Sequence, residues 1–261
     1  LVPEDKDSLK LRLGDGNGFG AESSFNLQLS SFPTPLTSKP SKGSHRFCSI
    51  DAVSNEALIF SFKKRSKNNS DETWKVQSYD LFSESNKQAA WAMDDFDGNG
   101  WSDLVVSDSS LGELLFLPGK PHGQFGSAQE VPSLRGVSAL HPIRVGKKRS
   151  PSLLILSRDE EALGLANFDK KGPFSFPDMI PTKGSPLVAV STDCDSDGVE
   201  EILVVTEKDS DFFLETWKLD QNGKPKKLHE HELKDLRREP VGLFPCHLDQ
   251  DEAIDLFVLS G

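Results

Sequence analysis

The chain has 261 residues and a formal net charge of −11, with 41 acidic against 30 basic side chains. Only 36% of its residues are hydrophobic, and no apolar run approaches the length of a membrane-spanning helix, which excludes such a span. The acidic balance argues against nucleic-acid binding, because neutralising phosphates needs a basic face. The length is sufficient to bury a sizeable hydrophobic core.

The start of the chain and its cysteines give few functional signals. The sequence begins at Leu1 in a context that is neither a start methionine nor a secretory leader, so we expect a portion of a longer protein. Cys48, Cys194 and Cys246 are an odd number at wide spacings, without a Cys-x-x-Cys pair. This pattern predicts small buried side chains and no disulfide framework.

An acidic loop recurs along the chain in units of about fifty residues, each time before a short apolar run. Residues 95–103 read DFDGNGWSD, residues 193–201 read DCDSDGVEE, and residues 247–255 read HLDQDEAID. Between the first two, Ser152 precedes the apolar run of one copy whose acidic residues are erased, and the basic residues 144–149 stand in their place. A further weak copy upstream keeps only Asp51.

Short apolar segments flank these loops and predict β-strands. They are rich in β-branched and aromatic residues and are bounded by Gly, Asp, Asn, Ser and Pro. No stretch has a convincing helical period, and the single candidate, residues 230–238, is charged nearly all round and is predicted to be a solvated turn or loop. The expected strands lie at residues 45–50, 88–93, 114–117, 137–143, 163–166, 186–192, 213–219 and 240–246.

About four strands per unit predict an all-β fold, a β-propeller of about five four-stranded blades within this chain. We expect residues 1–261 to form a single propeller domain, in which residues 1–30 and 240–261 are complementary parts of one blade. Two alternatives stay open. Either the ring closes by pairing the chain ends, or the chain is a portion of a larger ring, for example a seven-bladed one.

The acidic loops have the composition of a cation site. The first two place carboxylates or an amide at positions 1, 3, 5 and 9 and a carbonyl at 7, an oxygen set that suits Ca²⁺, and the third has the same pattern except for His247 at position 1. Gly98 and Gly198 permit sharp reversals, and the close carboxylates would repel one another without a cation. An EF-hand is excluded because its Glu at position 12 is replaced by Val106 and Val204. The alternative is that Asp, Asn and Gly simply form good turns, but the recurrence of the loops before similar strands favours Ca²⁺.

Together these residues resemble FG-GAP or VCBS repeats, the blades of integrin-α-like propellers. The match is carried by residues 95–106, by the glycine-aromatic turns at 11–20 and 123–126, and by partial repeats at 193–205 and 249–259. The resemblance implies a propeller in which Ca²⁺ rigidifies one face while other loops bind a ligand. It predicts two Ca²⁺ sites and leaves open a third, in which His247 replaces an oxygen ligand. By position, the implied ligands are Asp95, Asp97, Asn99, the Trp101 carbonyl and Asp103 in the first loop, Asp193, Asp195, Asp197, the Val199 carbonyl and Glu201 in the second, and Asp249, Asp251 and Asp255 in the third.

The sequence carries no marked catalytic motif. It lacks a nucleophile elbow, a P-loop and a dinucleotide-binding fingerprint. The segment His229-Glu230-His231 offers two zinc ligands but no third in phase, so we interpret it as exposed and polar. We therefore expect a non-catalytic binding or adhesion module for a protein or glycan ligand, with no nucleic-acid partner.

Two other functions remain open at this stage: a carbohydrate-binding lectin, and an accessory or catalytic domain of a polysaccharide-degrading enzyme. The resemblance implies an extracellular, cell-surface or periplasmic location, and the oligomeric state is left open.

Overall fold

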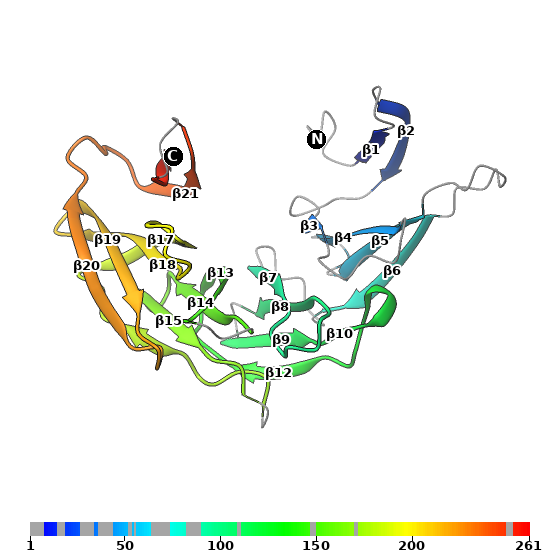
Figure 1. Cartoon of the computed structure of the whole chain (residues 1–261), viewed down its shortest axis with the longest axis horizontal. Coiled ribbons are helices and arrows are strands. Elements are labelled where there is room, and N and C mark those ends of the chain that lie inside the picture. Colours follow the sequence, from blue (N-terminus) through cyan, green and yellow to red (C-terminus); the bar gives the residue numbers. More distant parts are fainter. Residues whose placement is uncertain are drawn as a thin grey trace. The chain divides into compact units, whose positions relative to one another are not determined.

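A computed structural model describes the chain as a succession of antiparallel β-sheets (Figure 1). It describes residues 8–14, 19–26, 34–35, 44–51, 54, 56–63, 74–81, 90–108, 111–146, 150–169, 172–248 and 253–261. Within these residues there is no α-helix, only one 3₁₀ turn at Pro121–Gly123, and no helix with the length and hydropathy to cross a membrane. The chain divides into two compact units, Leu1–Gln88 and Ala89–Gly261.

The first unit contains a hairpin and one four-stranded sheet. In the hairpin, Arg12 on one strand donates to Glu22 on the other at 3.1 Å. The sheet has the order β3-β4-β5-β6, and its β5 is buried at Ala57–Phe60, which explains the apolar run there. The strands are β1 (Ser8–Gly14), β2 (Phe19–Asn26), β3 (Thr34–Pro35), β4 (Ser44–Asp51), β5 (Glu56–Lys63) and β6 (Trp74–Asp80).

The second unit contains three four-stranded sheets followed by a hairpin, and we name each sheet after its first strand. The β7 sheet comprises β7 (Trp91–Asp94), β8 (Asp103–Asp108), β9 (Glu113–Leu117) and β12 (Gln129–Pro132). The β13 sheet comprises β13 (Val137–Ile143), β14 (Ser152–Ser157), β15 (Ala162–Ala166) and β16 (Asp178–Ile180). The β17 sheet comprises β17 (Ser185–Thr192), β18 (Glu201–Lys208), β19 (Asp211–Leu219) and β20 (Pro225–Glu232). The hairpin pairs β21 (Pro240–Cys246) with β22 (Asp255–Ser260), and the short strands β10 (Gly119–Lys120) and β11 (Gln124–Phe125) flank the 3₁₀ turn.

Each sheet of the second unit is an antiparallel meander that begins with the strand nearest its neighbours. The strands pair in chain order within each sheet. Successive first strands contact one another, β7 with β13, β13 with β17, and β17 with β21. The predicted unit of about four strands is therefore confirmed for these three sheets. In the four-stranded sheet of the first unit, the strand before the weak acidic copy, β4, is not the first strand, because the short β3 pairs with its outer edge.

Two hydrophobic cores join the sheets of the second unit, and both include β14. All six residues of this strand are buried. Because strand side chains alternate between faces, Leu153 and Ile155 enter the core with the β7 sheet, while Leu154 and Leu156 enter the core with the β17 sheet. Burial on both faces explains why this strand is a continuous apolar run.

The strand register confirms the position of the erased copy. Ser152 pairs with Ile143 at the end of β13, as Asp103 pairs with Asp94 at the end of β7. The prediction that residues 230–238 form only a turn or loop is wrong at its start, because β20 continues to Glu232. This segment pairs with β19 through its backbone, which needs no apolar face of its own.

Candidate metal centre

Two acidic loops of the second unit each hold three carboxylates close enough to share a cation. In the first loop, between β7 and β8, one oxygen of each of Asp95, Asp97 and Asp103 lies within 4.8 Å of the other two. Oxygens bound to one Ca²⁺ at 2.3–2.6 Å lie at most about 5 Å apart, so the trio is close enough to contact one ion. The second loop, between β17 and β18, brings together Asp193, Asp195 and Asp197 in the same way.

Asp103 forms the buried base of the first loop. Its side chain is fully buried, and Oδ2 accepts hydrogen bonds from the backbone N–H groups of Phe96 and Asp97, at 2.8 and 3.1 Å. Oδ1 accepts a third bond from the Gly119 N–H at 2.6 Å. Burial nevertheless raises the pKa of Asp103 to about 7, and the negative charge of Asp97 adds to the rise. Ionising Asp103 is therefore unfavourable unless a cation is near.

Asp95 presents an oxygen that has no hydrogen-bond partner. Its Oδ2 accepts a bond from the Gly100 N–H at 2.9 Å, whereas Oδ1 is buried and unpaired. Burial is also the main cause of the raised pKa of Asp95. A buried carboxylate oxygen without a donor is costly, and Asp97 and Asp103, whose oxygens lie close by, bring further negative charge. A bound cation would offset the negative charges of all three carboxylates at once.

Asn99 ties the acidic residues of the first loop to the adjoining backbone. Its amide nitrogen donates to Asp97 Oδ2 at 2.8 Å and to the Gly119 carbonyl at 3.1 Å, and its Oδ1 accepts from the Trp101 N–H at 2.8 Å. Gly98 has a φ of 74°, a left-handed conformation that favours glycine, which confirms the predicted reversal. That Asn99 and the Trp101 carbonyl are metal ligands stays a prediction.

The second loop has the same backbone frame. Asp193 Oδ2 accepts from the Gly198 N–H at 2.8 Å, and Glu201 Oε2 accepts from the Cys194 N–H at 3.0 Å, matching the bonds of Asp95 and Asp103. Both left-handed positions of the first loop are kept: Ser196, with a φ of 59°, stands where the first loop has Gly98, and Gly198, with a φ of 83°, stands where it has Gly100. The implied Val199 carbonyl ligand stays a prediction.

The second loop differs from the first because it contains a lysine. Lys218 Nζ lies 2.6 Å from Asp197 Oδ2, 2.8 Å from Glu201 Oε1 and 3.5 Å from Asp195 Oδ2. These contacts raise the pKa of Lys218 and lower that of Asp197. Sequence reasoning missed Lys218, because it lies on β19 and only the pairing of β19 with β18 brings it to the loop.

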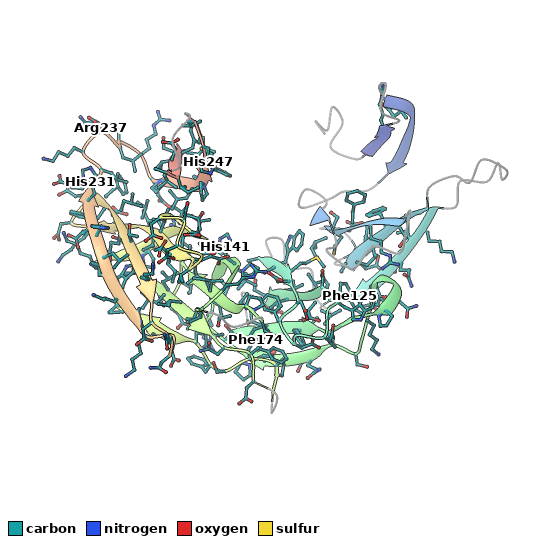
Figure 2. The ribbon with its side chains drawn as sticks, viewed as in Figure 1. Phe125, His141, Phe174, His231, Arg237 and His247 are labelled. Carbon is teal, nitrogen blue, oxygen red and sulfur yellow. The ribbon has the colours of Figure 1, made fainter. Side chains whose placement is uncertain are left out.

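The third loop is described only in part. Asp249 and Asp251 lie outside the described residues. The Leu248 N–H donates to Asp255 Oδ2 at 2.7 Å, as Phe96 does to Asp103, and His247 Nδ1 lies 3.1 Å from the Ala253 carbonyl. Figure 2 labels His247 beside the β21–β22 hairpin. That Asp249, Asp251 and Asp255 hold a third ion stays a prediction.

In the erased loop, an arginine connects the end of β7 to the second acidic loop. Arg144 directly follows β13, as Asp95 follows β7. Its Nη2 lies 2.8 Å from Asp94 Oδ2, and its backbone N–H donates to Glu200 Oε2 at 3.0 Å. A basic residue thus joins the end of β7 to the second loop.

The His229-Glu230-His231 segment is exposed on β20, as predicted. Glu230 pairs with Lys183 at 2.6 Å and with Lys227 at 2.9 Å. The residue between the two histidines therefore belongs to an ion-pair network.

No protein-family model matches the chain, and no curated protein matches it. Several solved structures are similar to it in fold. One is a protein of unknown function from Desulfotomaculum acetoxidans, with a TM-score of 0.53 and 12% identity, over 86% of this chain and 63% of that one. Another is a protein from Lactobacillus plantarum, also with a TM-score of 0.53, at 11% identity, over 87% of this chain and 65% of that one. The chain spans less than two thirds of each, and the likeness concerns the β fold alone.

Proposed function

We propose that this chain is part of a calcium-binding β-propeller that acts as a non-catalytic binding module for a protein or glycan ligand. Calcium would bind at the first acidic loop and hold the β7–β8 connection in one conformation. Blades similar to FG-GAP or VCBS repeats would form the scaffold. The surfaces that contact the ligand would be provided by other loops of the same blades.

The unpaired Oδ1 atom of Asp95 is the observation that carries the calcium proposal. Hydrogen bonds from the loop backbone hold the other acidic groups in place, yet this buried oxygen receives none. Ca²⁺ prefers oxygen ligands, tolerates irregular geometry and accepts several carboxylates at once. Asp95, Asp97 and Asp103 would hold the ion, with Asn99 and the Trp101 carbonyl completing the set by position.

The succession of meander sheets supports the propeller part of the proposal. Each sheet places its first strand against the first strand of the next, as blades do around a central axis. We propose about five blades in this chain, as a whole ring or as a portion of a larger one. The partial coverage of both similar structures is compatible with a larger parent.

Calcium titration tests the metal site directly. After removal of metal with EGTA, isothermal titration with CaCl₂ should release heat and the melting temperature should rise. A ligand present at 100 times its Kd adds about 2.7 kcal/mol to the free energy of unfolding. Asp97→Asn should abolish the first-loop share of the heat and of the stabilisation.

Asp235→Asn is the matched control, because Asp235 is an exposed residue in the turn after β20 and its loss removes the same charge. This variant should bind calcium as the wild type does. If wild-type protein neither releases heat nor gains stability, or if both variants behave alike, the calcium proposal is wrong.

A glycan array, together with assays for polysaccharide cleavage, separates the binding module from its alternatives. Binding of defined glycans without turnover would favour the lectin. Measurable cleavage would favour the enzyme and contradict the non-catalytic proposal. Retention on a protein ligand that EGTA weakens would support the module as stated.

A further inference from the structure

The two acidic loops share a backbone frame but face different residues across the sheet. Glu201 pairs with Lys218 in the β18–β19 register, one position before Ile202 and Trp217. In the β7 sheet, the pair Leu104 and Leu117 stands where Ile202 and Trp217 stand, so the residue that corresponds to Lys218 is Pro118. The first loop therefore faces an uncharged residue where the second faces an ammonium group.

We propose that Lys218 is a built-in cation of the second loop, which takes the place of a calcium ion and leaves that loop free of metal in the wild-type protein. Its ammonium group contacts three carboxylates that the sequence assigned to the metal, at the distances already given. The expected total of one bound Ca²⁺ per chain rests on the proposed calcium site of the first loop. The role of Lys218 in the second loop rests only on its own contacts.

The strand holds Lys218 in a fixed position beside the loop. Its neighbours Trp217 and Leu219 are both only 4% exposed and belong to the core between the β13 and β17 sheets. Because side chains alternate along a strand, anchoring these two residues directs Lys218 to the opposite face. The ammonium group reaches the loop from a rigid element.

A calcium ion and this ammonium group would compete for the same oxygens. An ion bound to Asp197 Oδ2 and Glu201 Oε1 at 2.3–2.6 Å would stand no more than about 5 Å from Nζ, which lies 2.6 and 2.8 Å from the same two oxygens. The two like charges would repel strongly at such a separation. The lysine also donates a charge-assisted hydrogen bond to Asp197 Oδ2 at 2.6 Å.

The first loop has no equivalent compensation among the described residues. Across from Asp103, the strand offers the backbone of Gly119, whose N–H and carbonyl bond to Asp103 and Asn99. These groups carry no net charge. Among the described residues, the carboxylates of the first loop thus have only uncharged partners, whereas those of the second contact Lys218.

Calcium stoichiometry in paired variants tests the inference. In wild-type protein, Asp195→Asn should leave the number of bound Ca²⁺ ions unchanged. Lys218→Met should gain one ion per chain, measured by equilibrium dialysis with metal analysis, and adding Asp195→Asn to that variant should remove the gained ion. Lys218→Arg, which keeps the positive charge, should gain none.

Lys226→Met controls for net charge. Lys226 is exposed on β20 and pairs with Lys218 in the strand register, and its loss should gain no ion. Circular dichroism of every variant establishes that the sheets are intact. If Lys218→Met alone unfolds, Lys218→Gln serves in its place.

Two results would overturn the inference: a loss of one ion when Asp195→Asn is made in the wild type, or no gain in Lys218→Met and Lys218→Gln. Failure of the proposed function gives a different pattern. In that case Asp97→Asn would change nothing, while the comparison of Lys218 and Asp195 variants would still report on the second loop.

Discussion

The rings of Phe96 and Phe174 pack edge to face, with centroids 5.3 Å apart and an interplanar angle of 75°. Phe96 is the second residue of the first acidic loop, whereas Phe174 precedes β16 in the neighbouring sheet. Phe174 also meets Phe116 of β9 at 5.7 Å. The candidate metal loop is thus anchored in the core between the β7 and β13 sheets (Figure 2 labels Phe174).

Truncation of Phe96 to alanine should destabilise the protein and loosen the loop. The side chain is fully buried, and large-to-small changes of this kind cost about 3–5 kcal/mol. Urea unfolding should show this loss, and calcium affinity should fall as well. Phe176→Ala is the control, because Phe176 is 58% exposed and its truncation should cost little. Equal effects of the two variants would contradict the anchoring role.

Gly119 is expected to tolerate no side chain. A Cβ at this position would lie 2.4 Å from the Ser102 carbonyl oxygen, so Gly119→Ala must displace the backbone that bonds to Asp103 and Asn99. Calcium affinity should fall at least tenfold by titration calorimetry. Gly172→Ala, where a Cβ meets nothing within 4 Å, should leave both affinity and stability near those of the wild type. Unchanged affinity in Gly119→Ala would refute the expected distortion.

Glu215 should be among the most sensitive charged residues of the β17 sheet. It is fully buried on β19, where its carboxylate pairs with Lys227 at 2.8 Å and accepts bonds from Thr206 and Trp217. Glu215→Ala leaves the donors of Thr206 and Trp217 unpaired in the buried site and removes one of the two carboxylates that contact Lys227, and each unsatisfied buried donor costs about 1–3 kcal/mol. Thermal melting measures the effect, with exposed Glu232→Ala as the control. A loss no greater than in the control would show that the network is dispensable.

His141 on β13 should make stability depend on pH (Figure 2). Burial lowers its pKa below the usual 6.5, so the unfolded chain binds the proton more readily than the folded one. Stability is therefore full above about pH 6.5 and declines as the pH falls through the window between that value and the lowered pKa. Urea unfolding at about pH 7 and pH 5 should show this decline, and it should be smaller in His141→Gln. Exposed His229→Gln should keep the wild-type decline, and an equal change in both variants would contradict the assignment.

Local features of the fold could be predicted from the sequence because they depend on neighbouring residues. The apolar segment and its bounding turn residues predicted β13 at its observed bounds. The spacing of the repeats identified Ser152 as the residue equivalent to Asp103, and the strand register agrees. The grouping of Asp95, Asp97 and Asp103 followed from their positions in one loop. That residues 1–30 and 240–261 complete one blade stays a prediction.

Features that depend on strand pairing could not be predicted in the same way. Lys218 comes to the second loop through the β18–β19 register, and Arg144 connects Asp94 to Glu200 across neighbouring sheets. Neither contact has a local signature. A search for basic residues paired with the last carboxylate of each loop would have found Lys218 once the strands were aligned.

The double burial of β14 has a consequence for how the second unit unfolds. Leu153 and Leu154 are adjacent in the chain yet serve two different cores, so losing either neighbouring sheet strips one face of the same strand. Repeat proteins couple adjoining units through such shared interfaces, and their cooperativity spreads from neighbour to neighbour. A fragment cut between β16 and β17 should therefore melt earlier even in the sheet that it retains.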